Sequence, residues 1–413
     1  MHLYLLYLKR PIVAALLVML VYPASVAWSS GFGVFTQGAS ALGQADSVVA
    51  HVDGPSALFF NPALMNKLPG TQVEIGTTLL FPDRDFTALD GTTASTSDTV
   101  FAPSTFYLTH AFNDKISAGL AVFNPFGLGT DWGSTWGGGS LSSGLGRYLA
   151  TNSELTSWNI NPAASYRILP SLSVAAGLDI LYLDATLQSI APPSAAIPFE
   201  YGQRFTGTGS GVGYNFGLYY EVNEKLSLGA SYRSKVDVDV NGSLSLSISP
   251  LTFSGNTTIT LPQQVFAGVA YRPVDRLTLE AGMRWEDWSS FDKLQLNIIG
   301  LAPVVYPRGW HSTFAVNAGG DYRINDTFSL MAGYLFGWNP VPDGTFEPSI
   351  PDSDTHLFCL GGKARLDKLT VAMSYAYQLQ YDRNKSFNLY GPLAVGKYTT
   401  DVNMLSLSVG YAF

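Results

Sequence analysis

The most constraining feature of this chain is an alternation of apolar residues with small or polar ones, which runs to the last residue. Side chains in a β-strand alternate between the two faces, so such a run places all its apolar residues on one face. In the final run, the residues on that face are Leu405, Leu407, Val409, Tyr411 and Phe413. The same pattern recurs at 314–324, 328–336 and 369–377. It predicts a wall with lipid on one side and a lumen on the other.

The charge content supports a membrane wall over a soluble β-sandwich, which is the main alternative. Charged residues make up 13% of the chain, about half the share usual in soluble domains. The outward faces of a sandwich should be rich in Lys and Glu, whereas here Leu, Val and aromatic residues form the continuous face. The net charge of −8 offers no basic surface, so we expect no nucleic-acid partner. A single cysteine, Cys359, excludes an internal disulfide and a cysteine-based metal cage.

The N-terminus has the order of a secretory signal. Lys9 and Arg10 precede an apolar run over 12–22, and small residues follow at 25–27. We predict a signal peptide over residues 1–27, with an uncleaved anchor helix as the alternative. A mature protein without spanning helices must cross a membrane as a closed barrel, because lipid offers no partners to open sheet edges.

Connections of two lengths alternate along the chain. The short turns are centred on Asn113-Asp114, Leu169-Pro170, Asn223-Glu224, Val274-Asp275, Asn325-Asp326 and Asp367-Lys368. The long polar loops are expected at 82–101, 127–152, 190–204, 243–256, 298–309, 338–355 and 384–400. These connections predict about fourteen strands. The fold class is therefore all-β, a 14-stranded antiparallel transmembrane β-barrel over residues 71–413, in the outer membrane of a Gram-negative bacterium.

Residues 28–70 do not alternate, and we expect them to form an N-terminal hatch that plugs the barrel. A lumen enclosed by about fourteen strands is too wide for wall side chains alone to fill. The alternative is a disordered periplasmic tail, but the apolar cluster Leu58-Phe59-Phe60 argues against it, because disordered tails are poor in aromatic residues.

Several stretches carry a family resemblance. They are residues 30–43 ending in Phe60-Asn61-Pro62-Ala63, residues 122–130, residues 340–343 with 350–354, and the weaker Tyr232-Arg233-Ser234. In these stretches the chain resembles the FadL-type outer-membrane transporters of long-chain fatty acids and aromatic hydrocarbons. The resemblance implies a hatch, a pocket inside the barrel, and a lateral exit into the membrane where one strand is kinked.

The resemblance also assigns residues to these parts. It implies hatch residues Phe32, Phe60, Asn61, Pro62 and Ala63, and a lateral opening at Asn124, Pro125, Phe126 and Gly127. It places Phe32 and His311 at the ligand. Two positions where family members often carry a cation are Asp184 and the Trp310-His311-Ser312 stretch, and the loop at 191–201 is short. These departures favour an uncharged hydrophobic substrate.

Catalysis finds little support. The five histidines do not have metal-binding spacings, and nucleophile-elbow and phosphate-loop motifs are absent from the sequence. We therefore expect a transporter without catalytic residues, metal or cofactor. A porin-like channel for polar solutes and a lipid-acting enzyme with a Ser/His pair that meets only in space remain alternatives. Expected partners are a hydrophobic small molecule, membrane lipid, lipopolysaccharide and the barrel-assembly machinery through Phe413; we expect a monomer.

Two further groups of residues have two interpretations each. The wall charges Glu280, Arg284, Glu286, Arg233, Asp321, Arg323, Lys363 and Arg365 are either a polar path for solute or ion pairs that brace the hatch, and we favour the brace. The tryptophans at positions 132, 136, 158, 285, 288, 310 and 338 are either an interfacial girdle or part of a capture site, and we favour the girdle.

Overall fold

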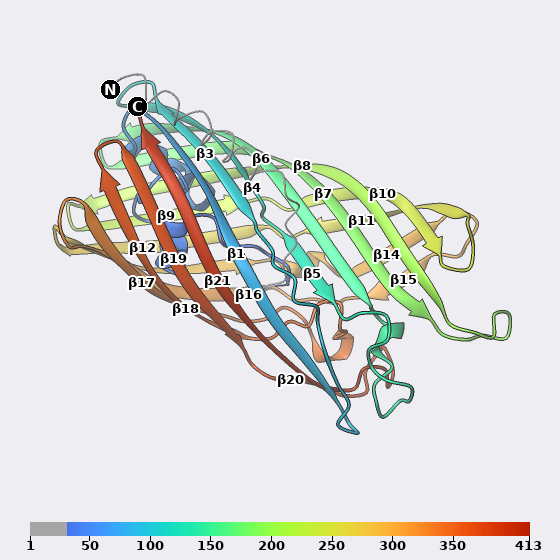
Figure 1. The fold of residues 1–413 in the computed structure, drawn as a ribbon. Coiled ribbons are helices and arrows are strands. Elements are labelled where there is room, and N and C mark those ends of the chain that lie inside the picture. Colours follow the sequence, from blue (N-terminus) through green and yellow to red (C-terminus); the bar gives the residue numbers. More distant parts are fainter. Residues whose placement is uncertain (1–30) are drawn as a thin grey trace, which may run out of the picture.

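The computed structural model describes residues 31–413, and the predicted signal peptide lies outside them. The described chain forms a closed antiparallel barrel of 14 wall strands, as predicted (Figure 1). The ring closes where the first strand pairs with the last, from Gln72 opposite Ala412 to Ala88 opposite Gly396. None of the helices in this part of the chain is long and apolar enough to cross a bilayer.

Three wall strands are interrupted, and each of these carries two labels. In order around the ring the wall consists of β1 (Thr71–Ala88), β3 (Ser104–Ala111), β4 (Ile116–Phe123) with β5 (Gly127–Asp131), β6 (Asn152–Leu169), β7 (Leu172–Ala191), β8 (Tyr201–Asn223), β9 (Leu226–Arg233) with β10 (Val236–Leu246), β11 (Thr252–Leu261) with β12 (Gln264–Val274), β13 (Leu277–Glu286), β16 (Thr313–Arg323), β17 (Phe328–Gly337), β18 (Thr355–Leu366), β19 (Leu369–Gln380) and β21 (Gly396–Ala412). Short strands extend the wall at the long-loop end: β2 (Thr93–Ser95), β14 (Lys293–Ile298), β15 (Val304–Pro307) and β20 (Arg383–Lys385).

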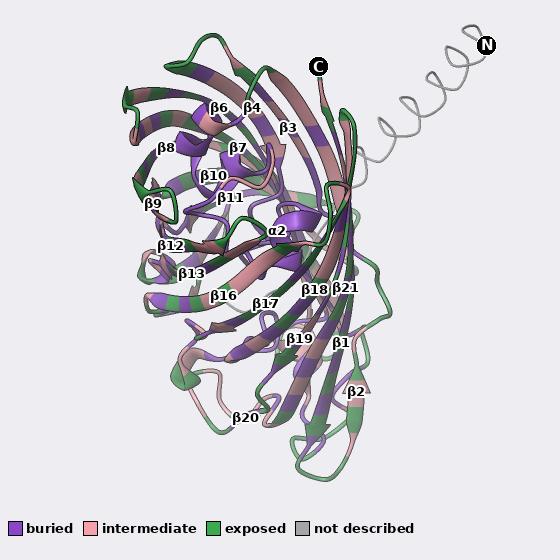
Figure 2. Ribbon diagram, turned by 90° about the vertical axis from the view of Figure 1, so that its left-hand side faces the viewer, coloured by how far each residue is buried: buried purple, intermediate pink, exposed green. Residues whose placement is uncertain are grey.

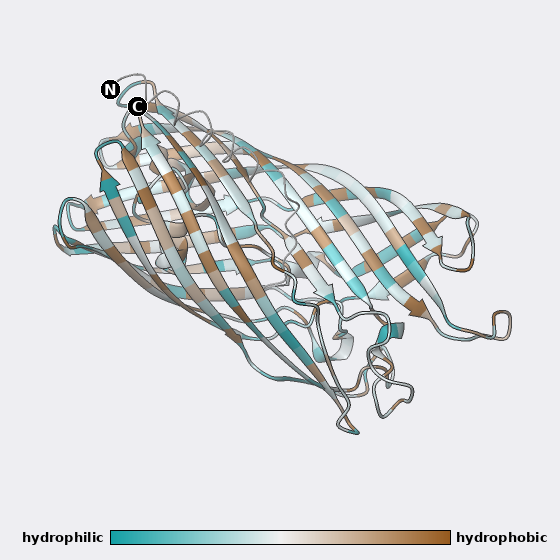
Figure 3. Cartoon of the chain, in the orientation of Figure 1, coloured by the Kyte–Doolittle hydropathy of each residue, from teal (hydrophilic) through white to brown (hydrophobic). Residues whose placement is uncertain are grey.

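The alternation follows the wall as the sequence predicts. In β21, Leu405 and Leu407 are exposed on the outside, whereas Ser406 and Ser408 are buried. Apolar and polar bands alternate along the strands that face the viewer in Figure 3. An apolar outer face removes the cost of placing polar side chains in lipid.

The six short turns lie where the sequence predicts them, and most loops are shorter than expected. The loop predicted at 298–309 is instead longer, covering 287–312, because β14 and β15 form a hairpin within it. The loop predicted to start at residue 82 begins only after Ala88, because β1 continues to that residue. In this extension Asp83 and Asp85 point outward, and Arg84 and Phe86 point inward and are buried. The hydrogen-bonded ladder thus continues beyond the lipid layer, where outward side chains become polar and the apolar signal is lost.

The N-terminal segment, residues 31–70, fills the ring from inside. It contains α2 (Ala39–Gly43), α3 (Ala57–Phe60) and the 3₁₀ helix η1 (Pro62–Lys67), and nearly all of its side chains are buried. Figure 2 shows α2 enclosed by the wall. We call this segment the plug.

Glycines in the wall allow the plug backbone to come close. A Cβ on Gly229 would lie 2.0 Å from the carbonyl oxygen of Val49, and one on Gly319 would lie 2.1 Å from that of Gln44. Both distances are far below a van der Waals contact, so only glycine fits at these two positions.

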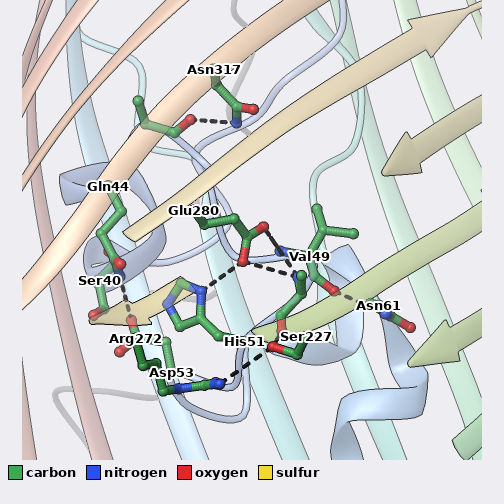
Figure 4. Close-up of polar contacts among 12 residues, drawn as sticks. Ser40, Gln44, Val49, His51, Asp53, Asn61, Ser227, Arg272, Glu280 and Asn317 are labelled. Atoms are coloured by element: carbon green, nitrogen blue, oxygen red, sulfur yellow. Dashed lines mark hydrogen bonds and ion pairs between the residues drawn. The ribbon is translucent and has the colours of Figure 1, made fainter. Parts of the chain in front are cut away.

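Charged wall residues hold the plug from several sides. Glu280 accepts hydrogen bonds from the backbone N–H groups of Val49 (2.6 Å) and Ala50 (3.0 Å), and it contacts His51 Nδ1 at 2.7 Å (Figure 4). Lys363 pairs with Asp53 of the plug and, at 2.7 Å, with Asp321 of the wall. These contacts support the interpretation that wall charges brace the plug.

The brace does not include every predicted charge. Arg323 Nη2 donates to the carbonyl of Asp275 at the rim of the short turns, and Arg365 is exposed. Both lie next to turns, which is why they can remain solvated without contacting the plug.

Replacing Glu280 tests this brace. In Glu280→Ala the N–H groups of Val49 and Ala50 lose a charged acceptor, each such bond being worth about 2 kcal/mol. Amide exchange at Val49 and Ala50 should accelerate roughly 30-fold, since 1.4 kcal/mol is a factor of ten. Glu224→Ala, at an exposed turn, is the matched control. Unchanged exchange in Glu280→Ala would show that the brace does not hold the plug.

Candidate transport site

Phe32 lies at the centre of a buried aromatic cluster inside the barrel. Its side chain is 1% exposed. Its ring centroid lies 4.6 Å from that of Trp288, 5.6 Å from Phe291, 6.0 Å from Trp310 and 6.1 Å from Phe126. Edge-to-face packing of this kind produces an apolar surface without a polar acceptor. This cluster is the region where an apolar molecule in the lumen would be stabilised.

The sequence did not reveal most partners of Phe32. Trp288 lies in the 3₁₀ helix η3 (Trp288–Ser290) after β13, and Trp310 lies in the connection before β16. Both come from a long loop that folds back into the lumen, and a loop has no alternation from which an inward direction could be predicted.

The tryptophan girdle is wrong for four of the seven predicted residues. Trp132, Trp136, Trp288 and Trp310 are all buried within the apolar interior. Trp132 and Trp136 stack on each other, with centroids 4.7 Å apart. Only Trp338 is exposed, and Trp158 and Trp285 are partly exposed. The location of a tryptophan near a strand end predicts how deep it lies in the membrane. It does not predict whether a tryptophan in a loop faces the lumen or the lipid.

The wall is interrupted at Asn124-Pro125-Phe126. β4 pairs with β6 up to Phe123 opposite Asn159, and β5 resumes this pairing from Gly127 opposite Thr156. A proline can also mark the end of a strand at a loop, but Pro125 does not, because β5 continues the strand beyond it. The three residues between β4 and β5 leave the ladder, as a proline without an N–H group requires.

Two polar side chains of the wall, Ser157 and Asn124, form hydrogen bonds with backbone groups at this interruption. Ser157 of β6 accepts from Phe126 N (2.9 Å) and donates to Phe126 O (2.6 Å) through its hydroxyl. The Asn124 side chain donates to Ser157 O (2.6 Å) and accepts from Ser104 N (3.0 Å). The sequence places Ser157 on the inward face, but only the pairing register puts it opposite the interruption.

The plug supplies hydrogen-bond partners for the backbone groups of the interruption that face the lumen. Val34 N donates to Pro125 O (2.8 Å), and Gly127 N donates to Phe32 O (2.8 Å). The Gln37 side chain donates to Asn124 O (3.0 Å). Backbone groups freed from a ladder inside a membrane are expected to face a wet or ligand-filled cavity. Here they do not, because their partners belong to the plug and to neighbouring strands.

The edge of β5 that faces β1 has no strand partner among residues 31–413. Its backbone carbonyl groups accept separate hydrogen bonds instead. Arg84 donates to Gly129 O (3.0 Å), and Ser97 N donates to Asp131 O (2.8 Å). Side chains and loop backbone thus replace a regular ladder along this part of the wall.

The Asn61-Pro62-Ala63 motif lies in the plug. Asn61 caps η1 by accepting from Ala63 N (3.1 Å), with Pro62 as the first residue of that helix. The Asn61 amide also donates to Val49 O and to Leu218 O of β8 (both 2.9 Å). Phe60 packs against Phe59 and Phe266. The motif therefore fixes a turn and joins the plug to the wall.

Two positions singled out by the resemblance lie outside the aromatic cluster. His311 is exposed and borders an open depression formed with Asn339, Asp354 and Arg383, so the structure does not bring it to Phe32. Asp184 points to the outside of β7. Of these two neighbouring residues, Trp310 is buried in the apolar interior, whereas His311 is exposed.

The sequence profile of the outer-membrane transport protein family OMPP1/FadL/TodX matches residues 20–413. The chain belongs to this family. The long-chain fatty acid transport protein of Salmonella typhi is 24% identical, and the alignment covers 88% of this chain and 91% of that protein. Outer membrane protein P1 of Haemophilus influenzae is 22% identical over 91% of this chain and 93% of its own length.

Solved structures of this family share the fold. A FadL homologue of Pseudomonas aeruginosa superposes with a TM-score of 0.82 at 21% identity, covering 93% of this chain and 100% of that one. The toluene transporter TodX of P. putida superposes with a TM-score of 0.73 at 18% identity, covering 91% and 98%. The family membership also establishes the outer membrane as the location.

Asn124→Ala tests whether the interruption is held as described. The substitution removes the side chain that accepts from Ser104 N and donates to Ser157 O, and the loss of buried hydrogen bonds costs about 1–3 kcal/mol. The variant should lose about 2 kcal/mol of unfolding free energy in guanidinium, measured in lipid vesicles. Asn384→Ala, at an exposed position of β20, should change it by less than about 0.5 kcal/mol. Equal stability of the two variants would contradict the assignment.

Proposed function

We propose that this protein carries small hydrophobic molecules passively across the outer membrane and releases them sideways at Asn124 to Gly127. One observation carries the proposal: Phe32 belongs to both parts of the route. Its ring is in the apolar cluster, and its carbonyl oxygen holds Gly127 N at the interruption. A molecule that displaces the Phe32 ring therefore also disturbs the bonds that hold the interruption closed.

Release into lipid agrees with the energetics of an apolar cargo. Burying each CH₂ group is worth about 0.8 kcal/mol. A route that ended in periplasmic water would lose this energy, whereas a route through the wall into the hydrocarbon layer retains it. The process needs no cofactor or energy source.

The interior supports this proposal over a porin-like channel. A polar solute at the level of Phe32 would meet Trp288, Phe291 and Trp310, all buried. It would lose hydrogen bonds to water without replacement, at a cost of several kcal/mol, roughly 2–7. The printed names of relatives, for fatty acids in one case and toluene in another, agree with a hydrophobic class. They also support a transporter over an enzyme.

We also propose the remaining partners and the division of the chain. Residues 1–27 serve as the signal peptide, 28–70 as the hatch and 71–413 as the barrel. The exposed C-terminal residue Phe413 is recognised by the barrel-assembly machinery, and the apolar outer face contacts lipid and lipopolysaccharide. The protein acts as a monomer.

Straightening the interrupted strand tests the lateral exit. Pro125→Val combined with Gly127→Val restores an N–H group and strand-forming side chains, so β4 and β5 can pair with their neighbours without a break. Uptake of radiolabelled toluene by cells that depend on this protein should fall at least tenfold. Pro162→Val, an outward-facing position of β6, is the control. If a straightened and well-assembled variant still delivers toluene at the native rate, the lateral route is refuted.

Phe32→Ala tests the apolar cluster separately. Removal of the ring from between Trp288 and Trp310 deletes about 2–3 kcal/mol of apolar contact, so affinity for a hydrophobic ligand should fall roughly 30-fold or more. Ligand affinity is compared at equal thermal stability, with Phe358→Ala on the outer face as control. An unchanged affinity would remove Phe32 from the site.

A further inference from the structure

The outer face of the barrel has an open depression of about 550 Å³ where β17, β18 and β19 reach the long-loop end. β20, which contributes to it, lies at the end of the barrel opposite the C-terminus (Figure 1). The lining of the depression is mostly polar and includes His311, Asn339, Asp354, Tyr381, Asp382 and Asn384. The proposed route through the lumen uses none of these side chains, so the depression is separate from uptake.

A row of three outward side chains crosses the edge of this depression. Tyr381 N donates to Asp354 O (2.9 Å), and the register of β17 and β18 places Trp338 opposite Asp354. Trp338 and Tyr381 are exposed, and Asp354 is half-buried. The row therefore places a carboxylate between two aromatic side chains.

The Asp354 carboxylate is held by one oxygen and leaves the other free. Oδ1 accepts from Asn339 N (2.9 Å) and from Asn339 Nδ2 (2.7 Å). Asn339 Oδ1 in turn accepts from the buried Arg383 (2.8 Å). Oδ2 is not buried, and among residues 31–413 it has no hydrogen-bond partner. It is an oriented acceptor that a molecule in the depression can reach.

The two aromatic rings of the row are also held in place. Tyr381 Oη contacts His356 Nε2 at 2.9 Å, and His356 Nδ1 contacts Tyr334 Oη at 2.7 Å. The rings of Tyr381 and His356 pack edge to face, with centroids 5.1 Å apart. Trp338 packs in the same way on Phe336, at 4.8 Å. A ligand therefore meets rings that are already ordered, which lowers the entropic cost of binding.

The row lies at the boundary of the apolar band of the outer face. On its membrane side the outward residues Phe358, Leu360 and Leu379 are exposed and apolar, whereas Asp382 and Asn384 beyond it are exposed and polar. Aromatic residues at such a boundary lie at the level of the lipid head groups. A strand rises about 3.3 Å per residue, so the depression extends roughly 10 Å beyond the row. Long loops face the outside of the cell, so this level is the head-group layer of the outer leaflet.

We propose that Trp338, Asp354 and Tyr381 bind one uncharged sugar ring of a lipopolysaccharide molecule. The outer leaflet of a Gram-negative outer membrane carries lipopolysaccharide, whose head group consists of sugars. The C–H faces of the ring pack on the two aromatic side chains, and a sugar hydroxyl donates to Asp354 Oδ2. A hydrogen bond to a carboxylate is about twice as strong as one between neutral groups. The inference rests on the lipopolysaccharide contact proposed above and is independent of the route through the lumen.

The charges around the depression disfavour a phosphate group as the ligand. Arg383 pairs with Asp343 (2.8 Å), and Lys397 pairs with Asp382 (2.6 Å). Asp354 has no ion-pair partner within the described chain, residues 31–413. An anion would therefore meet an unmatched negative charge, and an acyl chain would leave the carboxylate without a donor. An uncharged ring with hydroxyl groups uses both the aromatic surfaces and the free oxygen.

Two lipopolysaccharides test the sugar ring. Both carry the same lipid A and the same acidic inner sugars, but only one continues into neutral core sugars. Each is titrated into the full protein in detergent, and native mass spectrometry measures the bound fraction. We expect half-saturation by the longer molecule at a concentration at least tenfold lower. Equal half-saturation would overturn the site.

Replacing a tryptophan separates a sugar site from a general aromatic girdle. Trp338→Leu removes one of the two aromatic surfaces and should abolish the tenfold preference. Trp285→Leu is the matched control, because Trp285 is an outward tryptophan near the same end of β13, between Val265 and Phe314. This control should keep the preference. An unchanged preference in Trp338→Leu, or an equal loss in both variants, would contradict the assignment.

Asp354→Asn tests the free oxygen. Because Asn339 holds an acceptor at the position of Oδ1, the new amide places its NH₂ group where Oδ2 was. The preference should fall to about twofold or less, since the charged acceptor is lost. Asp326→Asn, at an exposed short turn, should leave it unchanged. A full tenfold preference in Asp354→Asn, at equal thermal stability, would remove the carboxylate from the site.

A competitor establishes that the sugar belongs to a lipid. Free core oligosaccharide, at the concentration of the longer lipopolysaccharide, should not displace it, because anchoring in the same micelle raises the effective concentration of the sugar ring. Complete displacement would show that the site takes a soluble sugar and would overturn the proposal. None of these measurements involves toluene uptake, so the lateral exit and the sugar site can each fail while the other stands.

Discussion

The structure depends on one constraint: every backbone N–H and C=O group in the hydrocarbon layer must have a partner within the protein, because lipid provides none. A closed antiparallel ring meets this requirement, and here β1 and β21 close it over their full paired length. The residues that leave the ladder between β4 and β5 do not escape the requirement. Ser157, Asn124 and the plug supply its partners. The interruption is therefore a polar site built into the wall, and its integrity depends on where the plug lies.

The plug and the wall are complementary in shape and in charge. Gly229 and Gly319 allow plug carbonyl groups to approach the strands closely, and Glu280 and Lys363 supply charged partners from the wall. Charged hydrogen bonds are stronger than neutral ones, and burial makes the loss of one partner costly. The plug is thus fixed near the short-turn end, while its first residues, from Phe32 to Gln37, contact the interruption.

The interior changes character along the barrel. Near the short turns the plug contacts charged and small side chains, whereas toward the long loops the lumen is aromatic and aliphatic, from Phe32 to Phe205 and Ile298. Luminal cations are largely matched within the protein, as Arg308 is by Glu347 and Arg383 by Asp343. An apolar interior with neutralised charges stabilises uncharged molecules, since an anion would lose hydration without gaining a free counter-charge. The absence of basic residues at Asp184 and His311 suggested the same substrate class, although these residues turned out to face away from the lumen.

The sequence by itself determined the barrel, its strand number, its short turns, the plug and the break at Pro125. Each depends on local chemistry: alternation assigns a side to every wall residue, and proline cannot donate to a ladder. Strand ends were placed less well, because the apolar signal stops at the edge of the lipid while the ladder continues to Ala88. Only the tertiary structure decided which loop residues enter the lumen, as Trp288 and Trp310 do, and which residues complete the break, as Ser157 and Gln37 do. These contacts join segments far apart in the chain, and their partners are set by the register and curvature of the closed ring, which no local pattern encodes.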